Sequence, residues 1–219
     1  MSPELEMVFF FLLAFLLLVL ITWLLYTFLK WDSENSRKFL HVSGGILCLL
    51  IPGYIQSHWS VLFLCVCALS LLAYTFFTRQ LPAIHRTKRV SYGSILFPLP
   101  VYGCFLVMSS TGILLYYYLP ILLLTIADTS AEMAGKKWGH LSLSFFKGQK
   151  TLIGSMAFLV MGMISALLHY FIGEHPPSYT LAVLLGIVLS AMVTELVSLK
   201  GFDNVTVPAV VLLLLYLVI

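Results

Sequence analysis

Four carboxylates lie inside or directly beside long apolar stretches of the chain. Asp128 and Glu132 share one stretch, Glu195 lies in a second, and Asp203 stands at the mouth of a third. A charged group at the centre of a membrane helix costs about 2.5–3.5 kcal/mol on insertion scales, so such residues face the interior and are candidates for function. Asp128 and Glu132 are four residues apart and share a helix face. Acids placed like this can hold a divalent cation, accept a proton or share one.

A structural explanation competes for some of these acids. Glu132 precedes Lys136 by four residues, which is the orientation in which an ion pair stabilises a helix. Glu195 has no basic residue within one turn. Asp128 lies about 12 Å below the helix end at Lys136 if each residue rises 1.5 Å. A simple ion pair therefore explains Glu132 better than it explains Glu195 or Asp128.

The polar segment after the first two acids combines glycines, lysines and hydroxyl groups. Its candidate phosphate-binding residues are Lys136, Lys137, Lys147, Lys150 and Thr151. Backbone amides beside glycines and the ammonium groups of lysines suit phosphate. No glycine directly precedes the lysine of 148–151, so we exclude a Walker A loop. A solvated basic loop is the alternative interpretation.

The chain as a whole has the composition of a membrane protein. Of its 219 residues, 61% are apolar and 10% are charged, and the mean hydropathy is +1.03. Soluble domains have about 25% charged residues. This difference excludes a soluble enzyme, a disordered chain and a nucleic-acid-binding protein that uses a basic face. The four cysteines lie in apolar runs, and Cys65 and Cys67 lack the spacing of a zinc site, so we expect buried, inert thiols.

Eight apolar stretches can each form a helix, and a membrane crossing needs about 20 residues. We therefore expect an all-α, polytopic integral membrane protein with about eight transmembrane helices, organised as a single transmembrane helical domain over residues 1–219. The stretches run about 7–29, 39–55, 59–77, 91–108, 113–134, 152–172, 180–199 and 205–219.

All 12 lysines and arginines lie in alternate connections between these stretches. The positive-inside rule places these connections in the cytoplasm and both termini outside. The charges could simply set the topology. However, the polar sequence and the buried acids gather at the same connections, so we expect the chemistry on the cytoplasmic side. The connections span about 30–38, 79–90, 135–151 and 200–204.

Five segments in series resemble a known family. They are Arg37-Lys38-Phe39-Leu40-His41; Arg89-Val90-Ser91-Tyr92-Gly93 with Phe97-Pro98; Ala127-Asp128-Thr129-Ser130-Ala131-Glu132-Met133-Ala134-Gly135-Lys136-Lys137-Trp138-Gly139; Lys150-Thr151 with Gly154-Ser155; and Glu195 with Lys200-Gly201-Phe202-Asp203-Asn204-Val205-Thr206-Val207-Pro208. In this order and spacing the chain resembles the phytol kinase and dolichol kinase family. A yeast-type diacylglycerol kinase belongs to the same group, and phosphatidate cytidylyltransferases are distant relatives.

The resemblance implies a membrane kinase that phosphorylates a lipid alcohol, such as phytol, a polyprenol, dolichol or diacylglycerol. It implies CTP as the phosphoryl donor and Mg²⁺ as the cofactor. The lipid alcohol would enter from the bilayer and the nucleotide from the cytoplasm, at a bacterial plasma membrane. Two positions depart from the family pattern, because Ala127 replaces a frequent glycine and Ile153 replaces a frequent acid.

From these residues and the resemblance together we expect roles for individual positions, with Glu132 standing where relatives often have a small or hydroxyl-bearing residue. The expected metal ligands are Asp128, Glu132, Glu195 and Asp203. The expected catalytic residues are Asp128, Glu195 and Asp203, with Asp128 and Glu195 as equal candidates for the base. The expected nucleotide-binding residues are Lys136, Lys137, Lys147, Lys150, Thr151, Asn204, Arg37, Lys38 and His41.

Two other functions fit parts of the pattern. A cytidylyltransferase would use the same nucleotide and metal, would bind a lipid phosphate through Arg37 and Lys38, and would release pyrophosphate. A transporter would use the buried acids for proton coupling, and a non-catalytic scaffold would give them no chemistry. Against a transporter or a scaffold stands the gathering of polar groups on one face, without the internal repeat that many transporters show.

Overall fold

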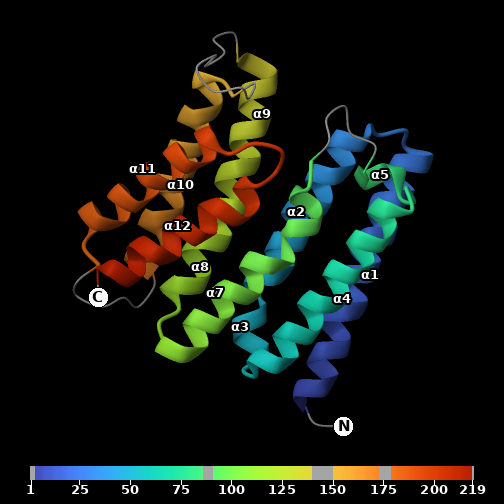
Figure 1. Cartoon of the computed structure of the whole chain (residues 1–219), viewed down its shortest axis with the longest axis horizontal. Coiled ribbons are helices and arrows are strands. Elements are labelled where there is room, and N and C mark those ends of the chain that lie inside the picture. Colours follow the sequence, from blue (N-terminus) through green and yellow to red (C-terminus); the bar gives the residue numbers. More distant parts are fainter. Residues whose placement is uncertain (1–2, 86–90, 140–149, 173–178, 219) are drawn as a thin grey trace.

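The chain folds into helices throughout the part that the structure describes. The computed structural model describes residues 3–85, 91–139, 150–172 and 179–218, which form helices and no strand. This confirms the all-α prediction. The elements are α1 (Pro3–Phe28), α2 (Ser33–Leu49), α3 (Ile51–Tyr54), α4 (His58–Phe77), α5 (Pro82–His85), α6 (Gly93–Leu96), α7 (Pro98–Thr111), α8 (Leu115–Leu122), the π-helical turn η1 (Leu123–Ala127), α9 (Asp128–Trp138), α10 (Leu152–Ile172), α11 (Leu181–Val197) and α12 (Asp203–Leu217) (Figure 1).

Each predicted apolar stretch is mainly helical, and some of these helices are long enough to cross a membrane. α11 and α12 are apolar but have 17 and 15 residues, and η1 interrupts the helix between α8 and α9. The long apolar helices are those of an integral membrane protein, whereas the number of eight crossings and the placement of both termini outside stay predictions. The helices of sufficient length and hydropathy are Pro3–Phe28, His58–Phe77, Gly93–Thr111 and Leu152–Phe171.

Helices extend into the connections that we predicted from the positions of the lysines and arginines. α2 begins at Ser33, because Asp32 accepts a hydrogen bond of 2.7 Å from the backbone N–H of Asn35 and thereby caps the helix. α9 continues to Trp138, beyond the expected end of its apolar stretch. The expected connection between the third and fourth stretches contains α5, and its residues 86–90 lie outside the described part. Charged residues are also favourable in the first and last turns of helices, so charge alone does not mark a loop.

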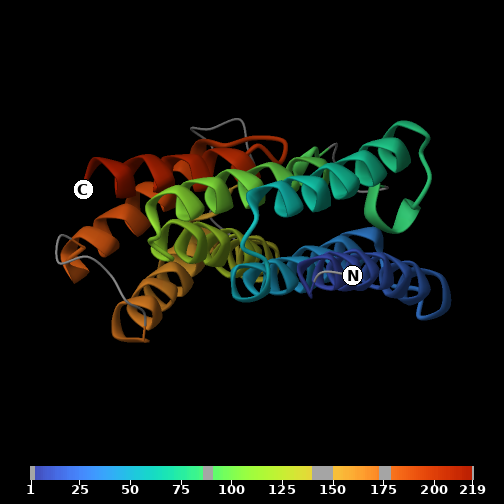
Figure 2. The same cartoon turned by 90° about the horizontal axis from the view of Figure 1, so that it is seen from below.

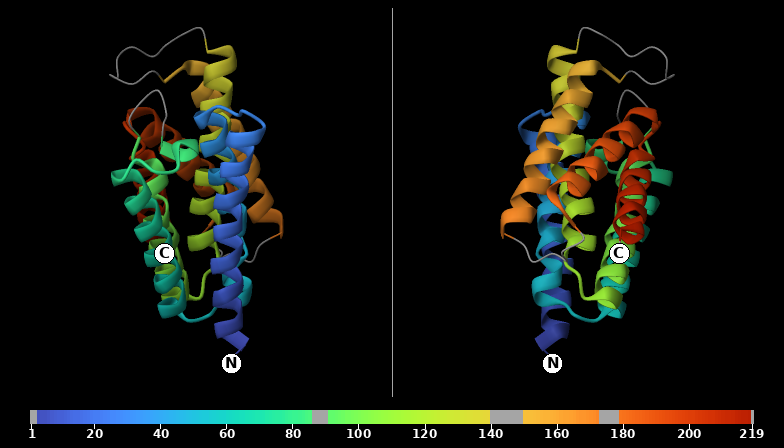
Figure 3. Two further views of the ribbon diagram at one scale, coloured as in Figure 1. Left: turned by 90° about the vertical axis from the view of Figure 1, so that its right-hand side faces the viewer. Right: turned by 90° about the vertical axis from the view of Figure 1, so that its left-hand side faces the viewer.

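The helices form two layers. Figure 2 shows α12, α7 and α4 side by side in one layer, with α1, α2, α8 and α9 in the other. α10 packs against α9 and α11, and α11 packs against α12, so these helices connect the layers. The C-terminal ends of α1, α9 and α11 and the N-terminal ends of α2, α10 and α12 lie together at one end of the molecule (Figure 3). Most of the polar sequence is therefore brought to a single end.

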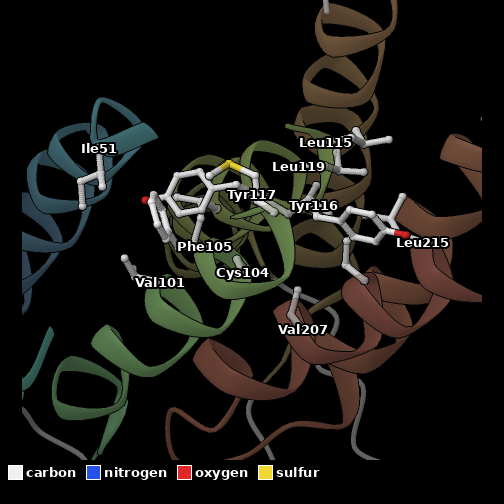
Figure 4. Close-up of a cluster of buried hydrophobic side chains, with 14 of the residues drawn as sticks. Ile51, Val101, Cys104, Phe105, Leu115, Tyr116, Tyr117, Leu119, Val207 and Leu215 are labelled. Carbon is white, nitrogen blue, oxygen red and sulfur yellow. The ribbon is translucent and has the colours of Figure 1, made fainter. Parts of the chain in front are cut away.

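The described apolar core consists of two separate clusters. The larger one surrounds α7, α8 and α12, and Figure 4 shows Phe105 and Tyr117 within it. The rings of these two residues meet edge to face, with their centres 5.9 Å apart. The Tyr117 hydroxyl donates a hydrogen bond of 2.7 Å to the carbonyl oxygen of Cys48, which ties α8 to α2. The smaller cluster joins α1, α2, α4 and α5 near the polar end. Its buried residues are Val19, Leu40, Leu72, Ala83 and Ile84.

Candidate functional site

Three of the predicted acids meet at the polar end of the bundle. Asp128 begins α9, Glu195 lies in the last turn of α11, and Asp203 begins α12. Each offers a carboxylate oxygen, and these oxygens lie within 4.8 Å of one another. Glu195 is 3% exposed. The fold therefore brings together three residues that lie far apart in the chain.

Lys150 is the counter-ion of these acids. Its Nζ pairs with Glu195 and lies 3.1 Å from Oδ2 of Asp203. Burial acts to lower the pKa of Lys150, but the carboxylates of Asp203 and Glu195 outweigh burial and raise it above the ordinary value of a lysine. Lys150 is therefore protonated at neutral pH. We call Asp128, Glu195, Asp203 and Lys150 the acidic cluster, since it has three carboxylates and one ammonium group.

Glycines let α10 approach α9 and bring Lys150 to the acids. A methyl group on Gly154 would lie 2.9 Å from the carbonyl oxygen of Ala131, and one on Gly135 would lie 2.8 Å from Oγ1 of Thr151. Small residues allow such close helix packing in membrane proteins. Thr151 Oγ1 accepts a hydrogen bond of 3.1 Å from the backbone N–H of Gly154. The predicted contact of Thr151 with a nucleotide stays a prediction.

A second charged group lies at the same end and is centred on Glu132. Its Oε1 lies 3.0 Å from Nη2 of Arg37 and 3.9 Å from Nζ of Lys38, and it pairs with Lys136. Lys136 also lies 3.0 Å from Oε2 of Glu34. We call these five residues the basic cluster, because three cations share two carboxylates. Glu132, a predicted metal ligand, lies among cations here, and its role as a ligand stays a prediction.

Two members of the basic cluster have capacity for a further anion. The Lys38 side chain is 14% exposed, with Glu132 3.9 Å away. Burial lowers the pKa of Lys38, although Glu132 partly offsets this effect. Arg37 donates from Nη1 to Oγ of Ser91 at 3.3 Å, while its buried Nε finds no hydrogen-bond partner among the described residues. An anion such as phosphate would satisfy both groups.

His41 contacts the backbone just before Asp128. Its Nε2 lies 3.0 Å from the carbonyl oxygen of Leu124 in η1. A carbonyl can only accept, so Nε2 carries the proton of the neutral ring. The π-helical turn ends at Asp128, whose N–H bonds to the carbonyl oxygen of Leu123. Turns of this kind are frequent at functional sites. His41 therefore holds the turn that positions Asp128, and its predicted contact with a nucleotide stays a prediction.

Two segments from opposite halves of the chain close the site beside the acids. The backbone N–H of Tyr92 donates to the carbonyl oxygen of Lys200 at 2.9 Å, and Nδ2 of Asn204 donates to the carbonyl oxygen of Gly93 at 2.8 Å. Gly201 has a φ of 85°, which favours glycine, and a methyl group there would collide with the backbone of Gly93. Asn204 thus fixes the start of α6, and its predicted phosphate contact stays a prediction.

Of the two remaining predicted lysines, the structure describes Lys137. Nζ of Lys137 sits 4.8 Å from the centre of the Trp138 ring, a cation–π arrangement on the exposed side of α9. In the described part of the chain, Lys137 does not line the cavity that contains both clusters. Lys147 lies outside the described residues.

Both clusters open into one cavity of about 1590 Å³. We call the part lined by the acidic and basic clusters the polar chamber. From there the cavity continues between α1, α2, α4 and α7, where its walls are apolar, and we call this part the apolar arm. Residues of both apolar core clusters line it. The arm is defined by Phe11, Leu47, Ile51, Leu64, Ala68 and Val101.

Three residues of the site carried no separate prediction. Ser91 accepts a hydrogen bond from Arg37. Gly93 and Gly201 allow the close backbone contact beside the acids. They lie within the segments that carry the family resemblance, but a serine or a glycine does not by itself indicate a functional site. The sequence signal was their position next to charged residues, which is too common to single them out.

The donor set of the acidic cluster fits a divalent cation. Mg²⁺ prefers oxygen ligands and is usually bound by one or two carboxylates together with substrate phosphates. Asp128, Glu195 and Asp203 offer three such oxygens. Lys150 satisfies two of these acids, so a cation and Lys150 would share the cluster.

The chain is similar to a curated protein of known name. It is 25% identical over 184 residues to a phytol kinase of Synechocystis sp., a match that covers 80% of this chain and 76% of the relative. No family model matches the chain, and no solved structure matches it. The similarity spans most of both chains and supports a distant relation to the phytol kinases.

Proposed function

We propose that the protein is a membrane kinase that transfers a phosphoryl group from a nucleoside triphosphate to the hydroxyl group of a lipid alcohol. The observation that carries the proposal is the single cavity in which the acidic cluster, the basic cluster and the apolar arm meet. Its volume of about 1590 Å³ exceeds the roughly 300–1,000 Å³ of a typical ligand pocket, so it has room for two substrates together. The similarity to a phytol kinase supports the same class of acceptor.

The basic cluster is the proposed binding site for the triphosphate. Phosphoryl transfer depends on positioning and on neutralising charge, rather than on covalent chemistry by the protein. Lys38 and Arg37 have unsatisfied capacity beside the cavity, and Lys136 lines it as well. Glu132 offsets the mutual repulsion of these cations until an anion arrives. The family resemblance favours CTP as this anion.

The acidic cluster is the proposed site of transfer. Asp128, Asp203 and Glu195 would hold Mg²⁺, which supplies neutralisation of the phosphate charge when bound. Lys150 would turn from the acids toward the transferring phosphoryl group. Either Asp128 or Glu195 would accept the proton of the acceptor hydroxyl, because both carboxylates line the cavity.

The arrangement of the helices suggests where each substrate comes from. The charged clusters lie at the end of the bundle to which most of the basic residues belong, and the positive-inside rule makes this the cytoplasmic end. The nucleotide would therefore enter from the cytoplasm and the lipid alcohol from the membrane. The proposed location is a bacterial plasma membrane, with the site on its cytoplasmic side.

A transfer assay tests the proposed function. Purified protein in detergent is incubated with Mg²⁺ and γ-labelled CTP or ATP, and with phytol, farnesol, a polyprenol and diacylglycerol in turn. We expect label in the lipid fraction, with CTP preferred. An Asp128→Asn variant measured beside the wild type identifies any contaminating kinase, because only activity of the protein itself is lost in the variant.

Two results would contradict the kinase. Release of pyrophosphate with a lipid phosphate as acceptor, and no label in the lipid alcohols, would indicate a cytidylyltransferase. Absence of both reactions, in protein that retains its melting temperature, would favour a transporter or a scaffold.

A further inference from the structure

The hydrocarbon chain of the acceptor could lie in the surrounding lipid or inside the protein. We propose that it lies inside, in the apolar arm, and that Gly44 forms the passage between this arm and the polar chamber. The proposal rests on the proposed function, because it concerns the chain of an alcohol whose hydroxyl group lies at the acidic cluster.

The arm is a continuous apolar path of considerable length. Residues that recur every three or four positions on α2 and on α4 line it, so one face of each helix forms a wall. The wall from α2 to the start of α3 covers a rise of about 16 Å, roughly half of the hydrocarbon thickness of a bilayer. The wall residues are Leu40, Gly44 and Leu47 on α2, Ile51 at the start of α3, and Leu64, Ala68 and Leu72 on α4.

The far end of the arm lies within the larger apolar cluster. Phe11, Ile51 and Leu64 are buried there. Glu4 ties α1 to the start of α4, since its Oε1 accepts hydrogen bonds of 3.0 Å from the backbone N–H of Ser57 and from Oγ of Ser60. A chain that enters from the polar chamber would therefore end against buried apolar side chains.

Two adjacent glycines on α2 differ in what they face. A methyl group on Gly45 would collide with the side chain of Thr125, so Gly45 allows α2 to pack directly on η1. A methyl group on Gly44 would meet no described atom within 4 Å, although Gly44 is buried. Gly44 lines the cavity one turn beyond His41. It thus leaves open space at the point where the polar chamber passes into the arm.

The apolar lining of the arm indicates the kind of molecule that can bind there. Protein interiors are close-packed, and an apolar cavity does not hold water well. A space of this kind suits a hydrocarbon chain. Its continuity with the polar chamber means that the polar end of the same molecule reaches the acidic cluster, as an alcohol with one long chain would.

The first test compares octanol and hexadecanol as acceptors. Both are supplied at equal mole fraction within detergent micelles, so that partition from water does not distort the comparison. The chain then passes from detergent hydrocarbon to protein hydrocarbon, so the hydrophobic effect largely cancels. A chain bound in the arm predicts a kcat/KM that is several-fold higher for hexadecanol than for octanol, because the longer chain fills the arm and gains close-packed contacts. Equal efficiency for both alcohols would mean that the chain stays in the detergent or lipid, and would overturn the proposal.

The second test narrows the passage. Gly44→Leu is compared with Gly186→Leu, which also adds a leucine to a helical glycine with open space around it but lies outside the cavity lining. We expect Gly44→Leu to lower the ratio of hexadecanol to octanol efficiency several-fold, because the added side chain overpacks the passage when the hydrocarbon chain is bound. The ratio in Gly186→Leu should equal that of the wild type. The same ratio in both variants would contradict the proposal.

A second pair of variants covers the case in which Gly44→Leu does not fold. Ala68→Phe fills the arm from α4, and Val66→Phe adds the same ring two residues away on an exposed face. We expect Ala68→Phe to lower the ratio of hexadecanol to octanol efficiency, as Gly44→Leu does. Val66→Phe should leave this ratio at the wild-type value.

The third test does not depend on turnover. Hexadecanol with a photoreactive diazirine at its chain end is irradiated with the protein, and the labelled peptides are mapped. We expect label on arm residues such as Ile51 and Leu64, and loss of that label in Ala68→Phe. Label confined to exposed residues such as Val66 would overturn the proposal. Labelled arm residues in a protein without kinase activity would contradict the proposed function but support the binding site.

Discussion

The acidic and basic clusters line the same cavity, yet they balance their charges in opposite ways. In the acidic cluster, three carboxylates lie together, and the ammonium group of Lys150 pairs with two of them. In the basic cluster, three cations surround Glu132 and share Glu34 as a second acid. Buried charges need partners. One cluster therefore calls for a further cation and the other for a further anion, and a complex of Mg²⁺ with a triphosphate provides both.

The comparison also separates two acids that the sequence had treated alike. Asp128 and Glu132 lie four residues apart on one helix, but their surroundings come from different helices. Asp128 meets residues of α11 and α12, whereas Glu132 meets residues of α2. Their roles should therefore differ, and substitutions can test the difference.

The largest effect is expected at Asp128. Asp128→Asn keeps the shape of the side chain but removes its charge, and should lower turnover by about 10²-fold or more, the scale of a lost electrostatic contact to the transition state. Turnover at several Mg²⁺ and Mn²⁺ concentrations and the melting temperature are measured on one preparation. We expect partial recovery at high metal concentration and an unchanged melting temperature. Turnover like that of the wild type would remove Asp128 from the mechanism.

Lys150 should show the competition between its ammonium group and a metal ion. Lys150→Met leaves three acids without a counter-ion, so we expect lower turnover together with a larger rise in melting temperature when Mg²⁺ is added. Melting curves with and without Mg²⁺, compared with Ca²⁺ and with Na⁺ at equal ionic strength, measure this rise. A smaller rise than in the wild type would mean that Lys150 helps to hold the metal site together.

A substitution of Lys38 should affect nucleotide binding and protein stability in different ways. A pKa lowered by burial means that the folded protein holds this proton less tightly than the unfolded chain, so the charge reduces stability at any pH below the lowered pKa. Lys38→Met should therefore leave the melting temperature at neutral pH unchanged or raise it. The KM for the nucleotide should rise by about tenfold, the contribution of one charge-assisted contact. Lys137→Met is the control, since Lys137 lies over Trp138, and it should leave the KM unchanged.

The smallest effect is expected at Glu132. Glu132→Gln removes an acid that competes with the nucleotide for the same cations, so the KM for the nucleotide should fall a few-fold, at little change in the dependence on Mg²⁺. Initial rates over a grid of nucleotide and Mg²⁺ concentrations measure both. A loss of turnover that high Mg²⁺ restores, as expected for Asp128→Asn, would make Glu132 a metal ligand and would break the distinction between the clusters.

Sequence patterns predicted the helices and the meeting of the acids because both depend on local chemistry. Apolar runs of sufficient length form helices, and an acid inside such a run must face the protein interior. The position of Asp128, Glu195 and Asp203 in the interior of the bundle was therefore predictable. The sequence spacing did not reveal that Glu132 belongs with Arg37, because a helix face says nothing about which distant helix packs against it.

The cavity and the π-helical turn depend on packing and were not predictable. Gly44 and Gly45 are identical in sequence, and only the position of η1 against α2 decides that one faces space and the other faces Thr125. Lys137 and Lys136 are likewise neighbours of the same type, yet one lies on the ring of Trp138 and the other pairs with Glu34. In each case the direction of a helix face separates two residues that sequence reasoning had grouped.

The π-helical turn makes the helix tolerant of a change in chain length at one place and not at another. Such a turn contains one residue more than an α-helix needs. Deleting one residue from Leu123–Ala127 would therefore allow a continuous α-helix from α8 to α9 in which Asp128 still faces Glu195 and Asp203. A deletion between Asp128 and Glu132 has no extra residue to absorb it, so it would turn Glu132 by about 100° relative to Asp128. The acidic cluster would remain, whereas Glu132 would leave the basic cluster.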